Sequence, residues 1–127
     1  MPVEVHLVTP EREVWVGEAA QVTARGVDGD VGILVGHAPL LVQLAIGPLF
    51  ILREGQPELA AVIDGGFMHV ASRDGVTRVD VMATHAELAS EIDLAAARRR
   101  LEAAQQRSDK AADLEIAKAT ARIGLLG

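Results

Sequence analysis

The sequence predicts a mixed fold, in which an N-terminal flattened β-sandwich or barrel of about eight to ten strands precedes a C-terminal antiparallel two-helix hairpin. Up to about residue 83, short Val/Ile/Leu-rich runs alternate with Gly, Pro and Asp-Gly turns. After residue 84 the apolar spacing becomes that of amphipathic helices. Residues 1–87 carry 5 Lys and Arg against 12 Asp and Glu, whereas residues 88–127 carry 7 against 6. We therefore expect a β domain over 1–86 and a hairpin over 87–127.

Each strand expected in the β domain is a short apolar run that ends at a turn. Val3, Val5 and Leu7 alternate with polar residues, which is typical of a half-buried strand. The Asp-Gly pair at 74–75 lies between two alternating runs and predicts a tight hairpin. Trp15 and Phe67 are expected in the core. The other strands are expected over 13–16, 20–25, 49–53, 58–63, 67–72 and 76–82.

The stretch 29–41 is punctuated by three glycines and Pro39 but is otherwise mostly apolar. Glycine permits positive φ and proline fixes φ, so a structured loop is expected here. Asp30 and His37 are the polar groups that such a loop would present to a partner. The stretch is therefore a candidate docking surface.

Two short helices are expected after this β domain. Ser90 is placed to cap a first helix over 91–106, and Ser108-Asp109 to start a second helix that ends at Gly124. Alanines separate the few large apolar residues, so burial stabilises the hairpin little against the entropy of ordering it. We expect the hairpin to need the β domain or another protein, and to be able to exchange between docking sites.

Composition excludes several classes of protein. A net charge of −6 argues against a nucleic-acid partner, and the absence of cysteine excludes disulfides and thiolate metal sites. The most apolar run, 38–52, is shorter than the roughly 18 residues needed to span a bilayer, and no secretory signal opens the sequence. The protein is expected to be soluble, or peripheral to a membrane.

No pattern of catalytic or cofactor-binding residues is present. The four histidines lack metal-ligand spacing, and the glycine-rich stretch matches no phosphate-binding loop. Arg98-Arg99-Arg100 point in different directions around a helix and are expected to be solvated. A general acid/base pair of His37 with Asp30 or Asp64 stays open, since such groups need only meet in space. We expect no catalytic residues, no metal and no cofactor.

Two motifs resemble a known family, the epsilon subunit of F-type ATP synthases. Residues 29–40, GDVGILVGHAPL, are similar to the family's G-[ED]-x-G-I-x-P-G-H-x-P-L, with Val35 in place of the usual proline. Residues 65–67 are similar to its G-G-F. The resemblance covers the whole chain, including a β domain of this length followed by a helical hairpin.

The resemblance implies a non-catalytic rotor subunit in the central stalk, bound to the gamma subunit and to the c ring. Asp30, Gly36 and His37 would contact the c ring. The hairpin would permit ATP hydrolysis when folded on the sandwich, and inhibit it when extended along gamma toward the alpha/beta head. The lack of a transit peptide favours a bacterial or plastid-encoded origin, and we expect a peripheral position on the cytoplasmic face of the bacterial plasma membrane.

An alternative function is an ATP sensor. Some bacterial members of the family bind ATP through [IL]-D-x-x-R-A, and this chain has Ile92 and Asp93 but Ala96 at the arginine position. Lys118 and Arg122 resemble the family's basic pair on the second helix. We expect weak ATP binding or none.

Overall fold

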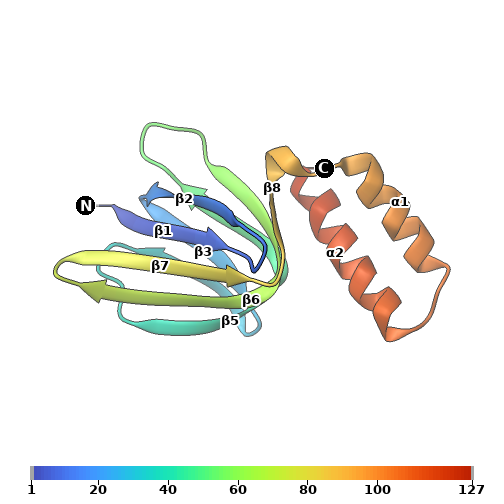
Figure 1. Ribbon diagram of the computed structural model, residues 1–127, viewed down its shortest axis with the longest axis horizontal. Coiled ribbons are helices and arrows are strands. Elements are labelled where there is room, and N and C mark those ends of the chain that lie inside the picture. Colours follow the sequence, from blue (N-terminus) through green and yellow to red (C-terminus); the bar gives the residue numbers. More distant parts are fainter. Residues whose placement is uncertain (1, 127) are drawn as a thin grey trace.

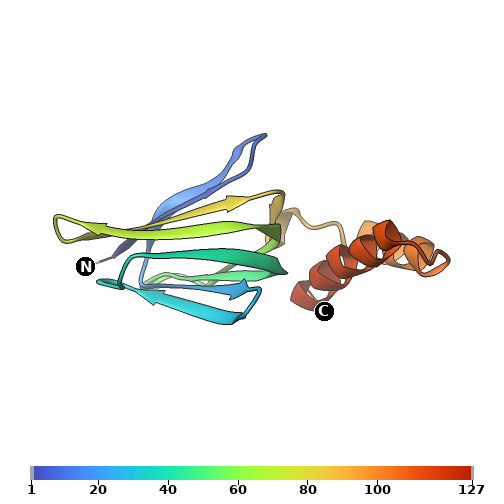
Figure 2. The ribbon, with the colours of Figure 1, turned by 90° about the horizontal axis from the view of Figure 1, so that it is seen from below.

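The computed structural model describes residues 2–126 (Figures 1 and 2). The expected β-sandwich followed by a two-helix hairpin is confirmed. The strands are β1 (Val3–Val8), β2 (Glu13–Ala19), β3 (Gln21–Gly26), β4 (Gly29–Leu34), β5 (Leu40–Leu52), β6 (Leu59–Arg73), β7 (Val76–Ala83) and β8 (Ala86–Leu88). They are followed by the 3₁₀ turn η1 (Ala89–Glu91) and the helices α1 (Leu94–Gln105) and α2 (Lys110–Leu126).

The strands form one continuous path in the order β2-β1-β7-β6-β5-β3-β4, with β8 added to β6. β1 runs parallel to β7, and the other pairs are antiparallel. β5 and β6 have 13 and 15 residues and take part in both layers of the sandwich. β2 and β4 are the two edge strands.

A glycine pair bends β6 between the two layers. Gly65 and Gly66 have φ of 86° and 133°, a region that side chains disfavour. A Cβ atom on Gly66 would collide with the carbonyl oxygen of Met82. The expectation of separate strands over 58–63 and 67–72 was therefore wrong, because the glycines bend the strand without ending it.

The sequence predicts one structured loop over 29–41, and this prediction was wrong. The first half of the stretch is the edge strand β4, which pairs with β3 from Val22 opposite Ile33 to Arg25 opposite Asp30. Only 35–39 form an irregular turn, after which Leu40 begins β5. Alternating Val31 and Ile33 face the core, and this alternation favours a strand over a loop.

The core lies between the two layers and is almost wholly aliphatic. Trp15 was predicted in the core, and it is partly buried against it. Phe67 is 48% exposed, so the prediction that it is a core residue was wrong. The largest fully buried side chains are Leu7, Ile33, Leu49, Ile51, Met68, Val3, Val5, Val22, Val62, Val70, Val79 and Val81.

The start of the hairpin differs from the prediction. Ser90 lies within η1, and Asp93 caps α1 by accepting a hydrogen bond from the Ala96 N–H at 2.9 Å. Asp109 accepts from the Ala112 N–H at 2.8 Å, which confirms the expected cap of α2. α2 continues through Gly124 to Leu126, so that glycine does not end the helix. β8 also crosses the boundary expected at 86/87.

The two helices lie antiparallel beyond one end of the sandwich (Figures 1 and 2). α1 packs against α2, and α2 also contacts β5, β6 and η1. The buried side chains of the hairpin are Ala97, Ala104, Ala112, Ala119 and Arg122. Among residues 2–126, no helix is both long enough and apolar enough to cross a membrane.

Candidate functional site

Asp30 lies at the start of edge strand β4, next to the turn that joins β3 and β4. Its carboxylate accepts a hydrogen bond from Arg25 Nε at 3.3 Å. The Asp30 side chain is 64% exposed and that of Arg25 is 51% exposed, so water screens this ion pair strongly. The carboxylate is free to approach a partner.

Gly36 and His37 lie in the turn after β4. Gly36 has φ of 82°, and its N–H donates to the hydroxyl of buried Thr77 at 2.7 Å. The Ser72 hydroxyl donates to the His37 carbonyl at 3.2 Å. These two bonds fix the turn to the β6–β7 hairpin, and they leave the His37 ring half-exposed, with Nδ1 2.8 Å from the Ala38 carbonyl oxygen.

β4 separates Asp30 from His37. The extended backbone from 30 to 34 alone spans about 13 Å at roughly 3.3 Å per residue. A general acid and base must lie within hydrogen-bond reach of the same group. His37 therefore does not form a catalytic pair with Asp30. His37 does not form a catalytic pair with Asp64 either, because both carboxylate oxygens of Asp64 accept hydrogen bonds from Arg122 of α2. Asp30 and His37 are instead two separate polar groups along one edge of the sandwich.

β2, β1 and β7 make one layer of the sandwich together with 66–73 of β6 and 40–44 of β5, and we call it the first layer. Its outer surface carries an apolar face, which sequence reasoning missed. We define it as Leu41, Phe67, Met82 and Val16, whose exposed fractions are 65%, 48%, 43% and 41%. Phe67 pairs directly with Met82 across β6 and β7. Paired residues in a sheet point to the same side, so the register groups these side chains. The row that runs from Leu41 to Val16 contains three polar residues between them, His69, Asp80 and His6.

The contact between α2 and the sandwich centres on Arg122. Its Nη1 and Nη2 donate to the two oxygens of Asp64 at 2.9 and 2.7 Å, and its Nε donates to Glu87 at 2.6 Å. Nη1 also donates to the Lys118 carbonyl at 2.9 Å. The exposed fractions of the side chains are 6% for Arg122, 4% for Asp64 and 23% for Glu87. We call these three side chains the clamp.

Burial opposes the charged form of Arg122. The hydrogen bonds to Asp64 and Glu87 outweigh that effect and raise the pKa of the guanidinium. Arg122 is therefore charged at neutral pH. Sequence reasoning singled out Arg122 but could not find its partners, because Asp64 and Glu87 lie 58 and 35 residues away.

The four residues of the ATP-sensor alternative do not share one cavity. A polar pocket of about 270 Å³ is lined by Lys118 and Arg122 together with residues of β6, β8 and α1. Asp93 instead caps α1, and Ile92 is half-buried in the link that precedes it. Four of the five N–H directions of Arg122 already point to protein acceptors.

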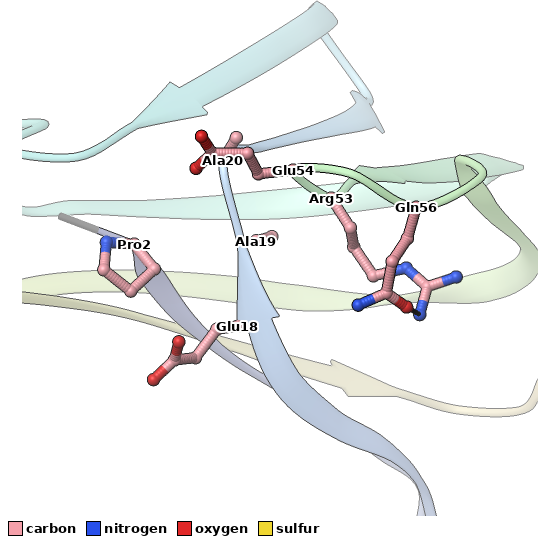
Figure 3. Close-up of a pocket in the computed structure, with 7 residues that line it drawn as sticks. All are labelled: Pro2, Glu18, Ala19, Ala20, Arg53, Glu54 and Gln56. Atoms are coloured by element: carbon pink, nitrogen blue, oxygen red, sulfur yellow. Dashed lines mark hydrogen bonds between the residues drawn. The ribbon is translucent and has the colours of Figure 1, made fainter.

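A second polar pocket, of about 340 Å³, is lined by Pro2, Glu18, Ala19, Ala20, Arg53, Glu54 and Gln56 (Figure 3), and the N-terminal end of the chain lies at the end of the sandwich away from the hairpin (Figure 1). Arg53 donates there to the Gln56 side chain at 2.8 Å and to the Pro57 carbonyl at 3.0 Å. Its Nε is buried without a partner among residues 2–126, but Glu18 and Glu54 line the same pocket and disfavour an anion. Arg53 thus holds the β5–β6 loop. Within the same described range, no group of three His, Asp or Glu side chains is placed to hold a metal ion.

Comparison with known proteins places this architecture in a family. The family model "ATP synthase, Delta/Epsilon chain, beta-sandwich domain" matches residues 2–89. The ATP synthase epsilon chain of Thermobifida fusca is 42% identical over 120 residues, covering 93% of this chain and 85% of that one. The epsilon chain of Streptomyces coelicolor is 38% identical over 128 residues, covering 96% and 100%.

Solved structures agree with the family match. A chain in the Euglena gracilis mitochondrial ATP synthase assembly of OSCP, F1 and c-ring has a TM-score of 0.81 and 27% identity, covering 99% of this chain and 82% of that one. A chain in the Tetrahymena thermophila central stalk and c-ring, at 19% identity and a TM-score of 0.54, shares the fold. The chain therefore belongs to the delta/epsilon family of ATP synthase subunits, and it is a non-catalytic subunit of the epsilon type.

Proposed function

We propose that this chain is a central-stalk, or rotor, subunit of a proton-translocating F-type ATP synthase, and that it couples the c ring and the gamma subunit to the catalytic head. The observation that carries the proposal is the apolar face on the first layer of the sandwich. Exposed apolar patches that are rimmed by polar residues mark protein interfaces. The gamma subunit is the partner that we assign to this face.

The second contact that we propose is with the c ring, through Asp30, Gly36 and His37. Asp30 lies at the start of edge strand β4 and His37 in the turn that follows it, and one side of β4 is unpaired among residues 2–126. The Gly36 turn is fixed by Thr77, so the position of His37 is defined before a partner binds. A preformed edge loses less conformational entropy on docking than a mobile loop does.

Replacing Phe67 with Glu tests the gamma contact. The charge would be desolvated at the centre of the apolar face, and we expect gamma to bind at least tenfold more weakly in a pull-down or by calorimetry. Leu52→Glu is the matched control, because Leu52 is 44% exposed on the other layer. Equal binding by the wild type and Phe67→Glu would refute the assignment of this face.

We further propose that the hairpin regulates ATP hydrolysis by leaving the sandwich and extending toward the alpha/beta head. Support comes from its limited attachment, because α1 packs on α2 and only α2 reaches the sheet extensively. Truncation after Glu91 in the assembled enzyme should leave assembly intact and raise the rate of ATP hydrolysis. An unchanged rate in the truncated enzyme would remove this role from the hairpin.

Membership of such an enzyme would place the chain peripherally, at the cytoplasmic face of a bacterial plasma membrane. We propose that it works there without a cofactor. The ATP-sensor alternative gains no support from the position of Arg122, whose donors are directed at Asp64, Glu87 and a backbone carbonyl.

A further inference from the structure

The clamp joins α2 to two strands of the sandwich. Arg122 belongs to α2, whereas Asp64 and Glu87 belong to β6 and β8. The bidentate pair with Asp64 is almost fully buried, at 6% and 4% exposure of the two side chains. Removing one member of a buried ion pair leaves the other charged and desolvated, so such a pair strongly disfavours partial disruption. Separating the two charges while they remain buried therefore costs a large free energy.

The apolar contact beside the clamp is incomplete. A groove of about 610 Å³ separates part of α2 from β5. Its walls include Ile46, Pro48 and Phe50 on the sheet, and Ile116 and Leu125 on the helix. Because these walls do not close on each other, apolar burial contributes only part of the attachment. The clamp has to supply much of the preference for the docked hairpin.

The root of the hairpin is fixed separately. Arg12 Nη1 and Nη2 donate to the two oxygens of Glu91 at 2.8 and 2.9 Å, and the Leu88 N–H donates to Glu91 Oε1 at 2.9 Å. Ile92 and Asp93 follow in extended conformations, with φ/ψ of −74°/126° and −90°/99°. These two residues connect an anchored turn to a helix.

We propose that Arg122 is the latch of the hairpin, and that the hairpin pivots at 92–93 when the latch opens. While the clamp is closed, α2 lies on β5 and β6. When it opens, Arg122, Asp64 and Glu87 each become hydrated, and the pair of helices moves as one body while Glu91 stays on Arg12. The latch deepens the regulatory role proposed above, although its first test needs only the isolated full chain.

The absence of cysteine makes a distance measurement straightforward. Glu54→Cys on the β5–β6 loop and Ser108→Cys between the helices give two exposed sites for spin labels. Pulsed electron resonance should show one dominant distance in otherwise wild-type chain. Arg122→Ala should lower the ratio of docked to released hairpin by about 100-fold, equivalent to about 2.8 kcal/mol at 1.4 kcal/mol per tenfold change.

Two further variants make the result specific. Asp64→Asn keeps the shape of the side chain and removes its charge, and it should release the hairpin while the thermal unfolding of the β domain is retained. Lys118→Gln removes a charge from the same pocket, one turn before Arg122 and outside the clamp, and should leave the hairpin docked. A docked hairpin in both Arg122→Ala and Asp64→Asn would overturn the latch, as would equal release by Lys118→Gln.

The assembled enzyme then separates the latch from the regulatory role. If Arg122→Ala releases the hairpin and changes the rate of ATP hydrolysis several-fold, both proposals hold. If the hairpin is released in the isolated chain but hydrolysis in the assembled enzyme is unchanged, the latch holds and the regulatory role fails. If the hairpin remains docked in both clamp variants, the latch fails whatever the hydrolysis rate.

Discussion

The β domain and the helical hairpin are stabilised in different ways. The β domain buries long aliphatic side chains such as Leu7, Leu49 and Met68 completely between two hydrogen-bonded layers. The hairpin buries four alanines and one arginine. Burial of a Leu or Met side chain stabilises by about 1.5 to 3 kcal/mol, whereas alanine offers one methyl group. The β domain is therefore stable through its own core, whereas the hairpin depends on the surface to which it is attached.

Alanine has a second consequence in the hairpin. Small side chains let the backbones of α1 and α2 approach closely, so the two helices contact each other along their lengths (Figure 1). The large apolar side chain of Leu114 on α2 is 48% exposed and adds little to this contact. The hairpin is thus coherent as a unit but weakly joined to the sandwich.

Substitutions in the core of the β domain should destabilise the protein most. Leu49→Ala should lower the free energy of unfolding by about 2 to 5 kcal/mol, because Leu49 is fully buried and a cavity would remain. Chemical denaturation of the full chain measures the change. Leu52→Ala, three residues along the same strand and 44% exposed, should change stability by no more than about 0.5 kcal/mol. Similar losses in the two variants would contradict the assignment of the core.

A smaller effect tests the packing of the hairpin. Ala112→Leu inserts a large side chain at a fully buried position between the helices and should cost about 1 to 3 kcal/mol of hairpin stability. Far-ultraviolet circular dichroism should show lost helix, while the unfolding of the β domain is kept.

Ala111→Leu provides the matched control for that change. Ala111 is exposed on the same turn of α2, and alanine and leucine have similar helix propensities. The control should retain its helical signal. If Ala112→Leu also keeps full helicity, the alanine contact does not hold the two helices together.

The sequence predicted the fold well, because its signals were local. Alternation in 3–7, Asp-Gly at 74–75 and the change of period after 84 all report on neighbouring residues. Asp93 rather than Ser90 caps α1, because η1 occupies 89–91 and delays the helix by one turn. The Gly65-Gly66 pair favours the end of a strand, but it lies inside β6. A glycine that bends a strand and a glycine that ends one cannot be distinguished from the sequence alone.

The candidate sites were less predictable, because they depend on distant pairings. The apolar face arises from the register of five strands, and Phe67 is exposed because it falls on the outward side of β6. The clamp joins residues 58 positions apart. Neither strand register nor a long-range ion pair can be read from one sequence. Arg122, at an otherwise inward-facing position of α2, was nevertheless a usable signal of a buried ion pair.

Glu91, at the root of the hairpin, should make a smaller contribution to stability, which is lost at low pH. Hydrogen bonds from Arg12 and from the Leu88 N–H lower the pKa of Glu91 in the folded protein. A lowered pKa means that the stabilisation is fully present above the pKa of the unfolded chain, and is lost as the pH falls through the folded pKa. Denaturation at pH 7 and at about pH 3 should therefore show less acid sensitivity in Glu91→Gln than in the wild type.

The contribution of Glu91 is small because Arg12 is exposed and water screens the pair. Glu102→Gln is a suitable control, since Glu102 is an exposed glutamate on α1. Identical acid sensitivity in Glu91→Gln and Glu102→Gln would show that this ion pair does not stabilise the root.

The smallest expected effect is that of ATP. Because Arg122 is occupied by the clamp, we expect titration calorimetry to give a dissociation constant weaker than about 1 mM, which is equivalent to less than about 4.1 kcal/mol of binding. A micromolar dissociation constant would mean that ATP competes successfully for Arg122. The attachment of the hairpin would then depend on a ligand as well as on the clamp.

The bend at Gly65 and Gly66 also brings two surface features close together along the chain. Because β6 passes through both layers, the strand that carries Phe67 also carries Asp64, three residues away along the same backbone. β6 stays paired with β5 on both sides of the bend, with Ile46 opposite Asp64 and Gln43 opposite Phe67. The apolar face and the clamp are therefore joined by one short, hydrogen-bonded stretch of backbone.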